Sequence, residues 1–273
     1  MVGGLASMFA YEKFDVFDEI VSTIPSDKVL TYSPLFREAF LFCLHEVNRE
    51  CAPVFNGGLT LSGIDSKKYP EKKEIKKIGY FYDEKFLKNV LEGFVGKGVK
   101  VKKLGLIPAN SNRTLSNKQK EELDFFDSML KKYFGADIRR DLENRFYSVN
   151  GMVPKYYELL QKSGVDALVF RVYYGLSYFP IILACKMLGI TVIDVQHGIN
   201  GLKHPCYSKF KSNEINSPLL PDVFWTWGDM ATRMLEKNSQ IGSSASIVEG
   251  GNPLYSSLEN RSGKKLLYTH QPQ

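Results

Sequence analysis

The sequence predicts an α/β fold with a mainly parallel, Rossmann-like sheet, and two observations lead to this prediction. The β-branched apolar run 190–195 stops abruptly at Gln196-His197-Gly198, which is typical of a buried parallel strand whose carboxyl end opens into a loop. On both sides of this run, segments of strand type alternate with segments of helix type, which is the pattern of a parallel sheet covered by helices.

The first part of the chain is expected to form a peripheral segment of helices and loops over residues 1–60. One helix should start at Ser33-Pro34, because a capping hydroxyl followed by a proline in the first turn is a common helix start. After a stretch rich in Gly, Pro, Ser and Lys, the alternation begins. A strand, a helix and a second strand are predicted over residues 75–82, 85–94 and 99–106.

Two helices are predicted in the middle of the chain. Ser116 and Gln119 have the spacing of a capping box, and the apolar periodicity that follows them should continue until Gly135 ends the helix. Residues 137–145 mix arginines with acidic residues at helical spacing, which is typical of an exposed helix with paired charges.

The second half of the chain gives the clearest alternation. A strand that ends at Arg171 and a helix over residues 176–188 precede the run at 190–195, so the three form a βαβ unit. Asp229 is well placed to cap a later helix over residues 230–237. Two further strands are expected within residues 221–228 and 246–253, and both stop at glycines.

His197 is the first candidate for a functional residue. Ligands of open α/β sheets bind in the crevice beyond the carboxyl ends of the strands, and His197 directly follows such an end. The alternative is a histidine that caps its strand and binds a neighbouring loop. Arg171 should lie at the same edge, where an arginine fork can hold a phosphate or carboxylate. The other candidates for substrate binding follow the strands at this edge: Gln196, Gly198, His204, Trp227, Gly228 and Asn252.

The order of these short motifs resembles a known family. Gln196-His197-Gly198, then Pro221-Asp222 with Trp227-Gly228, then Gly251-Asn252-Pro253, is similar to the capsule, teichoic-acid and lipopolysaccharide transferases of the GT-B fold. The resemblance covers about residues 160–273, and this chain departs from the pattern by adding Glu249-Gly250 before Gly251. It implies a two-domain enzyme, with acceptor groups in the N-terminal domain and a nucleotide-linked donor held mostly by the C-terminal one.

The resemblance implies a glycosyltransferase or polyol-phosphate transferase of cell-surface polysaccharide synthesis, with His197 as the general base. An imidazole has an ordinary pKa near 6.5 and can take a proton from an acceptor hydroxyl at neutral pH. The partners would be a nucleotide-sugar donor and a glycan or lipid-linked acceptor, without a metal or other cofactor. Two alternatives stay open: a nucleotide-sugar epimerase of the same fold, and a non-catalytic domain that binds polysaccharide or a partner enzyme.

The composition excludes several other classes of protein. The sequence lacks the motifs of dinucleotide-binding enzymes, P-loop NTPases, zincins and α/β-hydrolases, and it contains no Asp-x-Asp. Four scattered cysteines without a CxxC pair suggest neither a zinc site nor a disulfide framework, and no pattern of nucleic-acid binding is present. Without a signal peptide or an apolar run of roughly 18 residues, the protein is expected to be cytoplasmic. The oligomeric state is left open.

The net charge of +6 arises in one segment. Between Lys67 and Lys103 there are twelve lysines against five acidic residues. This surface could attract anionic lipid at the inner face of the membrane or a phosphorylated acceptor, but a solvated lysine-rich surface is the alternative and the favoured interpretation.

The domain organisation follows from the same patterns. Residues 1–255 are expected to form the Rossmann-like acceptor-side domain, the N-terminal half of a GT-B-like architecture. Residues 256–273 are expected to be a linker and the first strand of an incomplete C-terminal donor domain, because Lys264–His270 has strand composition after a polar stretch and nothing follows for it to pair with.

Overall fold

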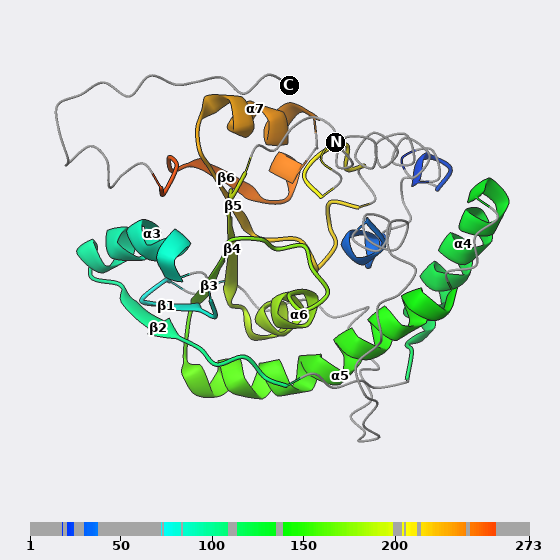
Figure 1. Cartoon of the computed structure of the whole chain (residues 1–273), viewed down its shortest axis with the longest axis horizontal. Helices are drawn as coiled ribbons and strands as arrows, with labels where there is room; N and C mark the ends of the chain where they lie inside the picture. The colour runs from blue at the N-terminus through cyan, green and yellow to red at the C-terminus, as the bar shows by residue number, and fades with distance from the viewer. Residues whose placement is uncertain are drawn as a thin grey trace, which may run out of the picture.

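The protein is built around one parallel sheet. The computed structural model describes residues 18, 21–24, 30–37, 72, 74–82, 84–108, 114–134, 139–198, 204, 206–211, 214–238 and 241–254. Within these residues the sheet has six strands in the order β2-β1-β3-β4-β5-β6, and every neighbouring pair is parallel (Figure 1). The strands are β1 (Lys77–Tyr80), β2 (Lys100–Lys103), β3 (Ala167–Phe170), β4 (Thr191–Val195), β5 (Val223–Thr226) and β6 (Ser246–Glu249).

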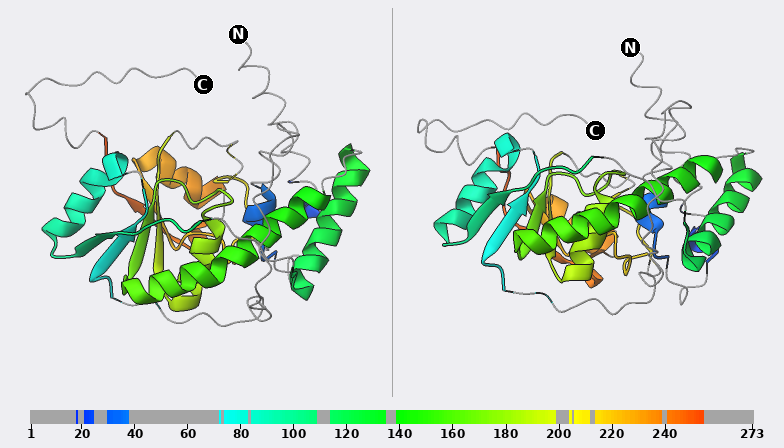
Figure 2. Two further views of the ribbon diagram at one scale, coloured as in Figure 1. Left: turned by 60° about the horizontal axis from the view of Figure 1, so that its bottom comes forward. Right: turned by 90° about the horizontal axis from the view of Figure 1, so that it is seen from below.

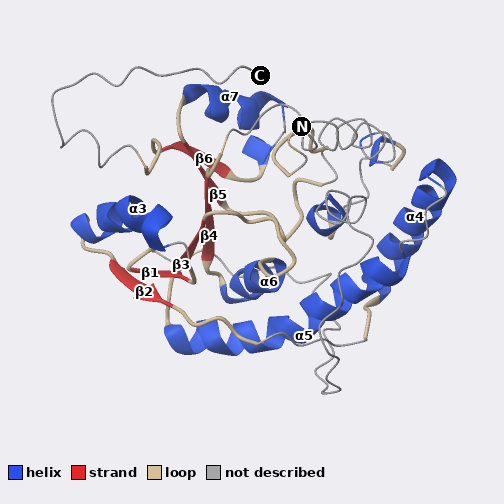
Figure 3. Cartoon of the chain, in the orientation of Figure 1, coloured by secondary structure: helices blue, strands red, loops and turns tan. Residues whose placement is uncertain are grey.

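Helices cover both faces of the sheet, so the fold is α/β and Rossmann-like, as the sequence predicts (Figure 3). One face packs against α3, and the other packs against α5, α6 and α7. The strands at the centre are buried on both faces, which explains their apolar composition. The helices are α3 (Glu84–Gly96), α4 (Asn117–Phe134), α5 (Arg139–Ser163), α6 (Phe179–Leu188) and α7 (Asp229–Asn238), with a short 3₁₀ turn η1 (Ile241–Ser243).

The strand order places the carboxyl ends of all strands at one edge. The registers pair Phe170 with Asp194, Asp194 with Phe224 and Thr226 with Glu249, so β3, β4, β5 and β6 end nearly level. The chain runs from β1 outward to β2 and then returns to β3 on the other side of β1. The topological switch point therefore lies between β1 and β3, where open α/β sheets form a crevice for ligands.

The described N-terminal turns, residues 21–24 and 33–37, pack beside α4 and α5 (Figure 2). Phe36 stacks on Phe126 of α4 with a centroid distance of 4.0 Å. A helical turn does start at Ser33-Pro34, as predicted, but Ser33 lies within the turn and does not cap it, since its hydroxyl donates to the buried Glu214. This tertiary partner takes the place of a local cap.

Local signals in the middle of the chain are confirmed, with one extension. The amide of Gln119 donates to Ser116 Oγ at 3.1 Å, and the amide of Ser116 donates to Gln119 Oε1 at 3.0 Å, so the capping box forms. The charged helix predicted over residues 137–145 continues to Ser163 as α5 and buries one face against α6 and the sheet. Its first turns do contain the expected pairs, such as Arg145 with Asp141 at 2.9 Å.

Two further expectations differ from the structure or lie outside it. Asp229 was predicted to cap α7, but it is the first residue of that helix and lies one position after the cap. Its carboxylate pairs with Arg233 at 2.7 Å. The predicted linker and strand over residues 256–273, and most of the predicted peripheral segment 1–60, lie outside the described residues. Among the described helices, none is long and apolar enough to cross a membrane.

Candidate functional site

His197 lies just beyond the carboxyl end of β4, beside a second histidine. The hydroxyl oxygen of Tyr174 is 3.4 Å from Nε2 of His197 and 3.2 Å from Nε2 of His204. Tyr174 comes from the loop after β3, and His204 comes from the long connection between β4 and β5. The structure therefore brings together two of the histidines that the sequence singles out, and a tyrosine stands between them.

The neighbouring Tyr173 holds this tyrosine in place. Tyr173 is fully buried, its hydroxyl donates to the carbonyl of Cys206, and its ring meets the edges of Tyr207 and Phe224. The ring of Tyr174 packs edge-on against Tyr173 and Tyr207, with centroid distances of 5.6 and 5.5 Å, so this aromatic cluster holds Tyr174 beside the histidines. The two adjacent tyrosines after a buried strand are thus an anchor and a functional candidate.

Gln196 joins the ends of β4 and β5. Its Oε1 accepts the amide hydrogen of Trp227 at 2.7 Å, and its own carbonyl accepts from the Trp227 indole. Its Nε2 donates to the carbonyl of Gly198 at 2.8 Å. With its side chain buried and these groups engaged, Gln196 shapes the two loops that flank His197. Gln196 and Trp227 are therefore better placed to form the wall of a site than to contact a substrate.

The glycines predicted at this edge have different surroundings. A Cβ atom added to Gly198 or to Gly228 would meet no atom within 4 Å, so the space beside both is open. At Gly250, an added Cβ would lie 2.0 Å from the indole of Trp225, and only a glycine lets the chain pass there. The glycine at position 250 is therefore explained by packing against Trp225.

Arg171 and Asn252 lie at the same edge of the sheet but have partners of their own. The Arg171 guanidinium stands 5.2 Å from the ring centroid of Phe86, at the start of α3 and close to the switch point. Its charge also acts on Tyr174, since it favours the ionised form of that phenol. Asn252 closes a turn by accepting from the amide of Leu254 at 3.0 Å. Arg171 is thus in electrostatic range of the Tyr174 hydroxyl, and Asn252 serves its own loop.

Burial shifts the pKa of two of these side chains, His204 and Tyr174. Burial, together with the nearby His197, lowers the pKa of His204 to about 4. His204 is therefore neutral at neutral pH and acts as a fixed hydrogen-bonding group. Burial likewise raises the pKa of Tyr174 above its ordinary value, so its hydroxyl keeps its hydrogen.

Beneath the site lies a carboxyl group that sequence reasoning missed. Asp194 of β4 is buried and accepts from the Tyr207 hydroxyl at 2.8 Å. Burial raises its pKa to about 8. An aspartate within the apolar run 190–195 was the available signal, because an acidic residue in a buried strand must find a partner or stay protonated.

The Pro221-Asp222 motif belongs to the opposite edge of the sheet. Asp222 precedes β5, and its carboxylate binds Lys186, Lys72 and the amide of Val192. Burial opposes its ionisation, but the charges of Lys186 and Lys72 outweigh this effect and lower its pKa. Asp222 therefore secures the amino ends of the strands and is remote from His197.

No group of three or more His, Cys, Asp or Glu residues able to hold a metal ion occurs in the part of the chain that the structure describes. Comparison with models of protein families and with curated proteins finds no match to this chain. The function of the protein is therefore inferred from the geometry around His197, at the carboxyl edge of the sheet.

Proposed function

We propose that the protein transfers a sugar or a polyol phosphate from a nucleotide-linked donor to a hydroxyl of a cell-surface polysaccharide acceptor. The observation that supports this proposal is the position of His197, beyond the carboxyl end of the central strand β4 and beside the hydroxyl of Tyr174. Ligands of parallel α/β sheets bind at this edge, and a histidine there can serve as a general base.

In the proposed reaction, His197 removes the proton of the acceptor hydroxyl. A cation-like sugar centre develops as the nucleoside diphosphate leaves. When the donor carries a polyol phosphate, the hydroxyl attacks the phosphorus that bears the polyol, the bond to the bridging oxygen breaks, and the nucleoside monophosphate leaves. The open space beside Gly198 and Gly228 gives room for the acceptor. Among the cationic side chains that the structure describes at this edge, Arg171 suits a phosphate group best, because its planar guanidinium can bind two oxygens at once.

The roles of His197 and His204 differ in this proposal. His204 stays neutral because burial lowers its pKa to about 4, so it holds neighbouring groups by hydrogen bonds. His197 is the residue that changes its protonation state. Residues after Leu254 would add donor-binding groups if the GT-B resemblance holds.

The test is turnover by the protein and its histidine variants. A panel of nucleoside-diphosphate sugars and polyols is incubated with a polysaccharide acceptor, and release of the nucleotide is followed. We expect His197→Ala to lower turnover by about 10²- to 10⁴-fold with a nearly unchanged melting temperature. His204→Ala should lower turnover less and lower the melting temperature more, because His204 packs on Tyr207 with a centroid distance of 4.9 Å.

Two results would contradict the proposal. If His197→Ala keeps near-normal turnover, or loses it only in proportion to lost folding, His197 is a strand cap and not a base. If the unaltered protein turns over no donor in the panel, the chain does not act as the proposed transferase, and polysaccharide binding without turnover becomes the next experiment.

A further inference from the structure

We propose that Tyr174 is a positioning residue that fixes the tautomer of His197. Its hydroxyl forms the last link in a chain of hydrogen bonds that begins at the backbone amide of Cys206. The chain runs from this amide through the imidazole of His204 and the hydroxyl of Tyr174 to Nε2 of His197. Each link has a direction, because the first group can only donate.

The first link sets the tautomer of His204. The Cys206 amide donates to Nδ1 of His204 at 3.3 Å, so this nitrogen must be without a hydrogen. His204 is neutral because burial lowers its pKa to about 4. A neutral imidazole carries one hydrogen, which is therefore on Nε2.

The second and third links follow from the first. Nε2–H of His204 donates to the hydroxyl oxygen of Tyr174 at 3.2 Å. The phenol keeps its own hydrogen because burial raises its pKa, and the other nearby ring nitrogen is Nε2 of His197, at 3.4 Å. The Tyr174 hydroxyl therefore donates to His197, so Nε2 of His197 is an acceptor and its hydrogen is on Nδ1.

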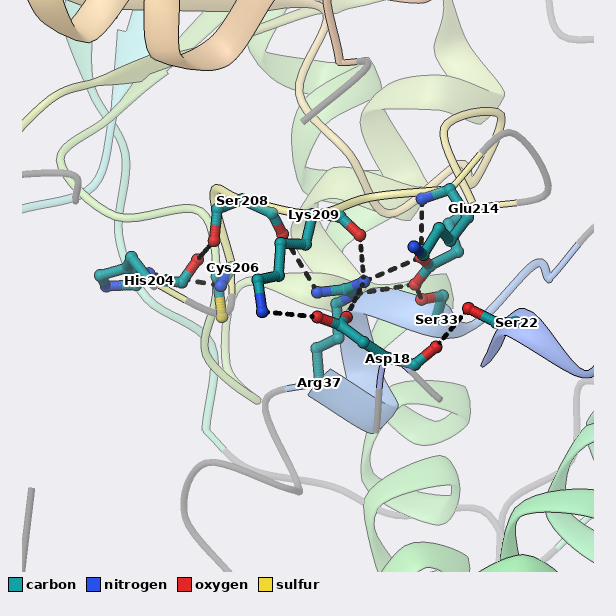
Figure 4. A network of polar contacts seen from close by, with 10 residues as sticks. Asp18, Ser22, Ser33, Arg37, His204, Cys206, Ser208, Lys209 and Glu214 are labelled. Carbon is teal, nitrogen blue, oxygen red and sulfur yellow. Dashed lines mark hydrogen bonds and ion pairs between the residues drawn. The ribbon is translucent and has the colours of Figure 1, made fainter. Parts of the chain in front are cut away.

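The backbone around His204 is firmly held, so the direction of the chain is built into the fold. The carbonyl of His204 accepts from the amides of Tyr207 and Ser208 at 3.0 and 2.9 Å, and from Ser208 Oγ at 2.8 Å. Ser208 in turn accepts from Arg37 through its carbonyl at 3.3 Å. Figure 4 shows His204, Cys206 and Ser208 at one end of a polar network that reaches Arg37 and Glu214.

The charged and titratable groups around Tyr174 do not reverse the direction of these hydrogen bonds at neutral pH. The groups that act on its phenol are Arg171, Cys206 and Asp194. Arg171 is permanently charged, and burial raises the pKa of Asp194 to about 8. None of them lies between Tyr174 and the two imidazoles in the chain of hydrogen bonds. The direction of the chain is therefore decided by the Cys206 amide.

The inference bears on catalysis through the proposed function, because it names Nε2 as the nitrogen that would take the acceptor proton. The link between Tyr174 and His197 is the longest of the three, so an approaching hydroxyl competes with the weakest bond of the chain. Removal of a group that orients a histidine costs about 10- to 100-fold in activity at metal sites, and a loss of this order in kcat is expected for Tyr174→Phe.

The experiment reads the tautomers directly and needs no substrate. Long-range proton–nitrogen correlation spectra of the ¹⁵N-histidine-labelled protein at neutral pH distinguish a ring with its hydrogen on Nδ1 from one with it on Nε2. His197→Gln and His204→Gln assign the two rings. We expect Nε2–H for His204 and Nδ1–H for His197 in the unaltered protein.

In Tyr174→Phe, His204 should keep Nε2–H because its Cys206 contact remains, while His197 should shift to the Nε2–H form that free imidazole prefers. Tyr157→Phe, a change of the same kind on α5, should alter neither ring. Nε2–H on His197 in the unaltered protein, or an unchanged His197 tautomer in Tyr174→Phe, would overturn the inference. Because donor and acceptor are absent from the measurement, its outcome is independent of the turnover test of the proposed function.

Discussion

Arg37 and Glu214 form a two-pronged ion pair in the core, although 177 positions of sequence separate them. Nε and Nη2 of Arg37 lie 2.7 and 2.8 Å from the two carboxylate oxygens of Glu214, and neither side chain is exposed. The guanidinium also stands 4.2 Å from the ring centroid of Phe210 and donates to the carbonyls of Ser208 and Lys209. This pair fastens the N-terminal segment to the connection that holds His204 (Figure 4).

Loss of Arg37 should strongly destabilise the protein. Arg37→Met leaves the Glu214 carboxylate buried without its cation, and breaking a buried pair in this way costs about 3–5 kcal/mol. Urea denaturation measures the loss. Arg37→Lys should rescue little, because a lysine cannot reproduce the fork. The matched control is Arg233→Ala in an exposed pair with Asp229, where a change below about 1 kcal/mol is expected. Equal effects of Arg37→Met and Arg233→Ala would contradict the importance of the buried pair.

Gly250→Ala should destabilise the protein by about 1–3 kcal/mol, because the new methyl group would overlap the indole of Trp225 and force it to move. That indole also donates to the carbonyl of Gly251 at 2.9 Å, so the loop would shift with it. Gly198→Ala is the control, since an added Cβ there meets open space. It should leave the melting temperature unchanged and, if acceptors approach at this point, lower turnover. A tolerated Gly250→Ala would mean that the Trp225 indole can move aside at little cost.

The stability of the protein should depend on the ionisation of Asp194. Burial raises the pKa of this carboxyl from 3.8 to about 8, so between these values the folded state holds a proton that the unfolded chain has released. Its contribution to stability therefore falls as the pH rises from about 4 to about 8, and is constant above. Asp194→Asn removes this dependence. The stability of the variant relative to the unaltered protein should therefore rise as the pH increases from about 4 to about 8.

Asp222→Asn is the control with the opposite sign. The pKa of Asp222 is lowered because Lys186 and Lys72 outweigh the effect of burial, so its carboxylate stabilises the fold above its ordinary pKa. The penalty for Asp222→Asn should be present at neutral pH and shrink in acid. Urea denaturation from pH about 4 to about 9 tests both signs. If the stability difference for Asp194→Asn does not vary with pH, Asp194 is not protonated in the folded protein.

The lysine-rich segment between Lys67 and Lys103 can be tested with liposomes. The edge strand β2 carries exposed lysines, and charged residues on an edge strand also prevent pairing with other chains. Lys88 and Lys76 form exposed pairs with Glu92 and Glu74, which reduces the available charge. If the segment binds a membrane, association should require anionic lipid and weaken as salt rises, since exposed charges are screened within about 8 to 10 Å. Association that is absent or insensitive to salt would leave the solvated-surface interpretation.

The local pattern of the sequence determined the elements of this protein. The apolar run 190–195 is β4, and Gln196-His197-Gly198 follows its end, because side-chain burial in a central strand requires a continuous apolar segment. The capping box of Ser116 and Gln119 spans three residues, so its hydrogen bonds depend on local geometry alone. The parallel direction of β3 and β4, and of β5 and β6, was also predictable, since α6 and α7 separate them and such crossovers connect parallel strands.

Only the tertiary structure decided which side chains meet. Tyr174 reaches His204 across 30 positions, and Arg37 reaches Glu214 across 177. Such contacts depend on how loops close and how helices pack on the sheet, and neither leaves a periodic signal in the sequence. The same cause separated Asp222 from the site, because a strand has two ends and the motif before β5 lies at the other one. Periodicity identifies a strand and its end, while the packing of distant segments selects the partners of His197.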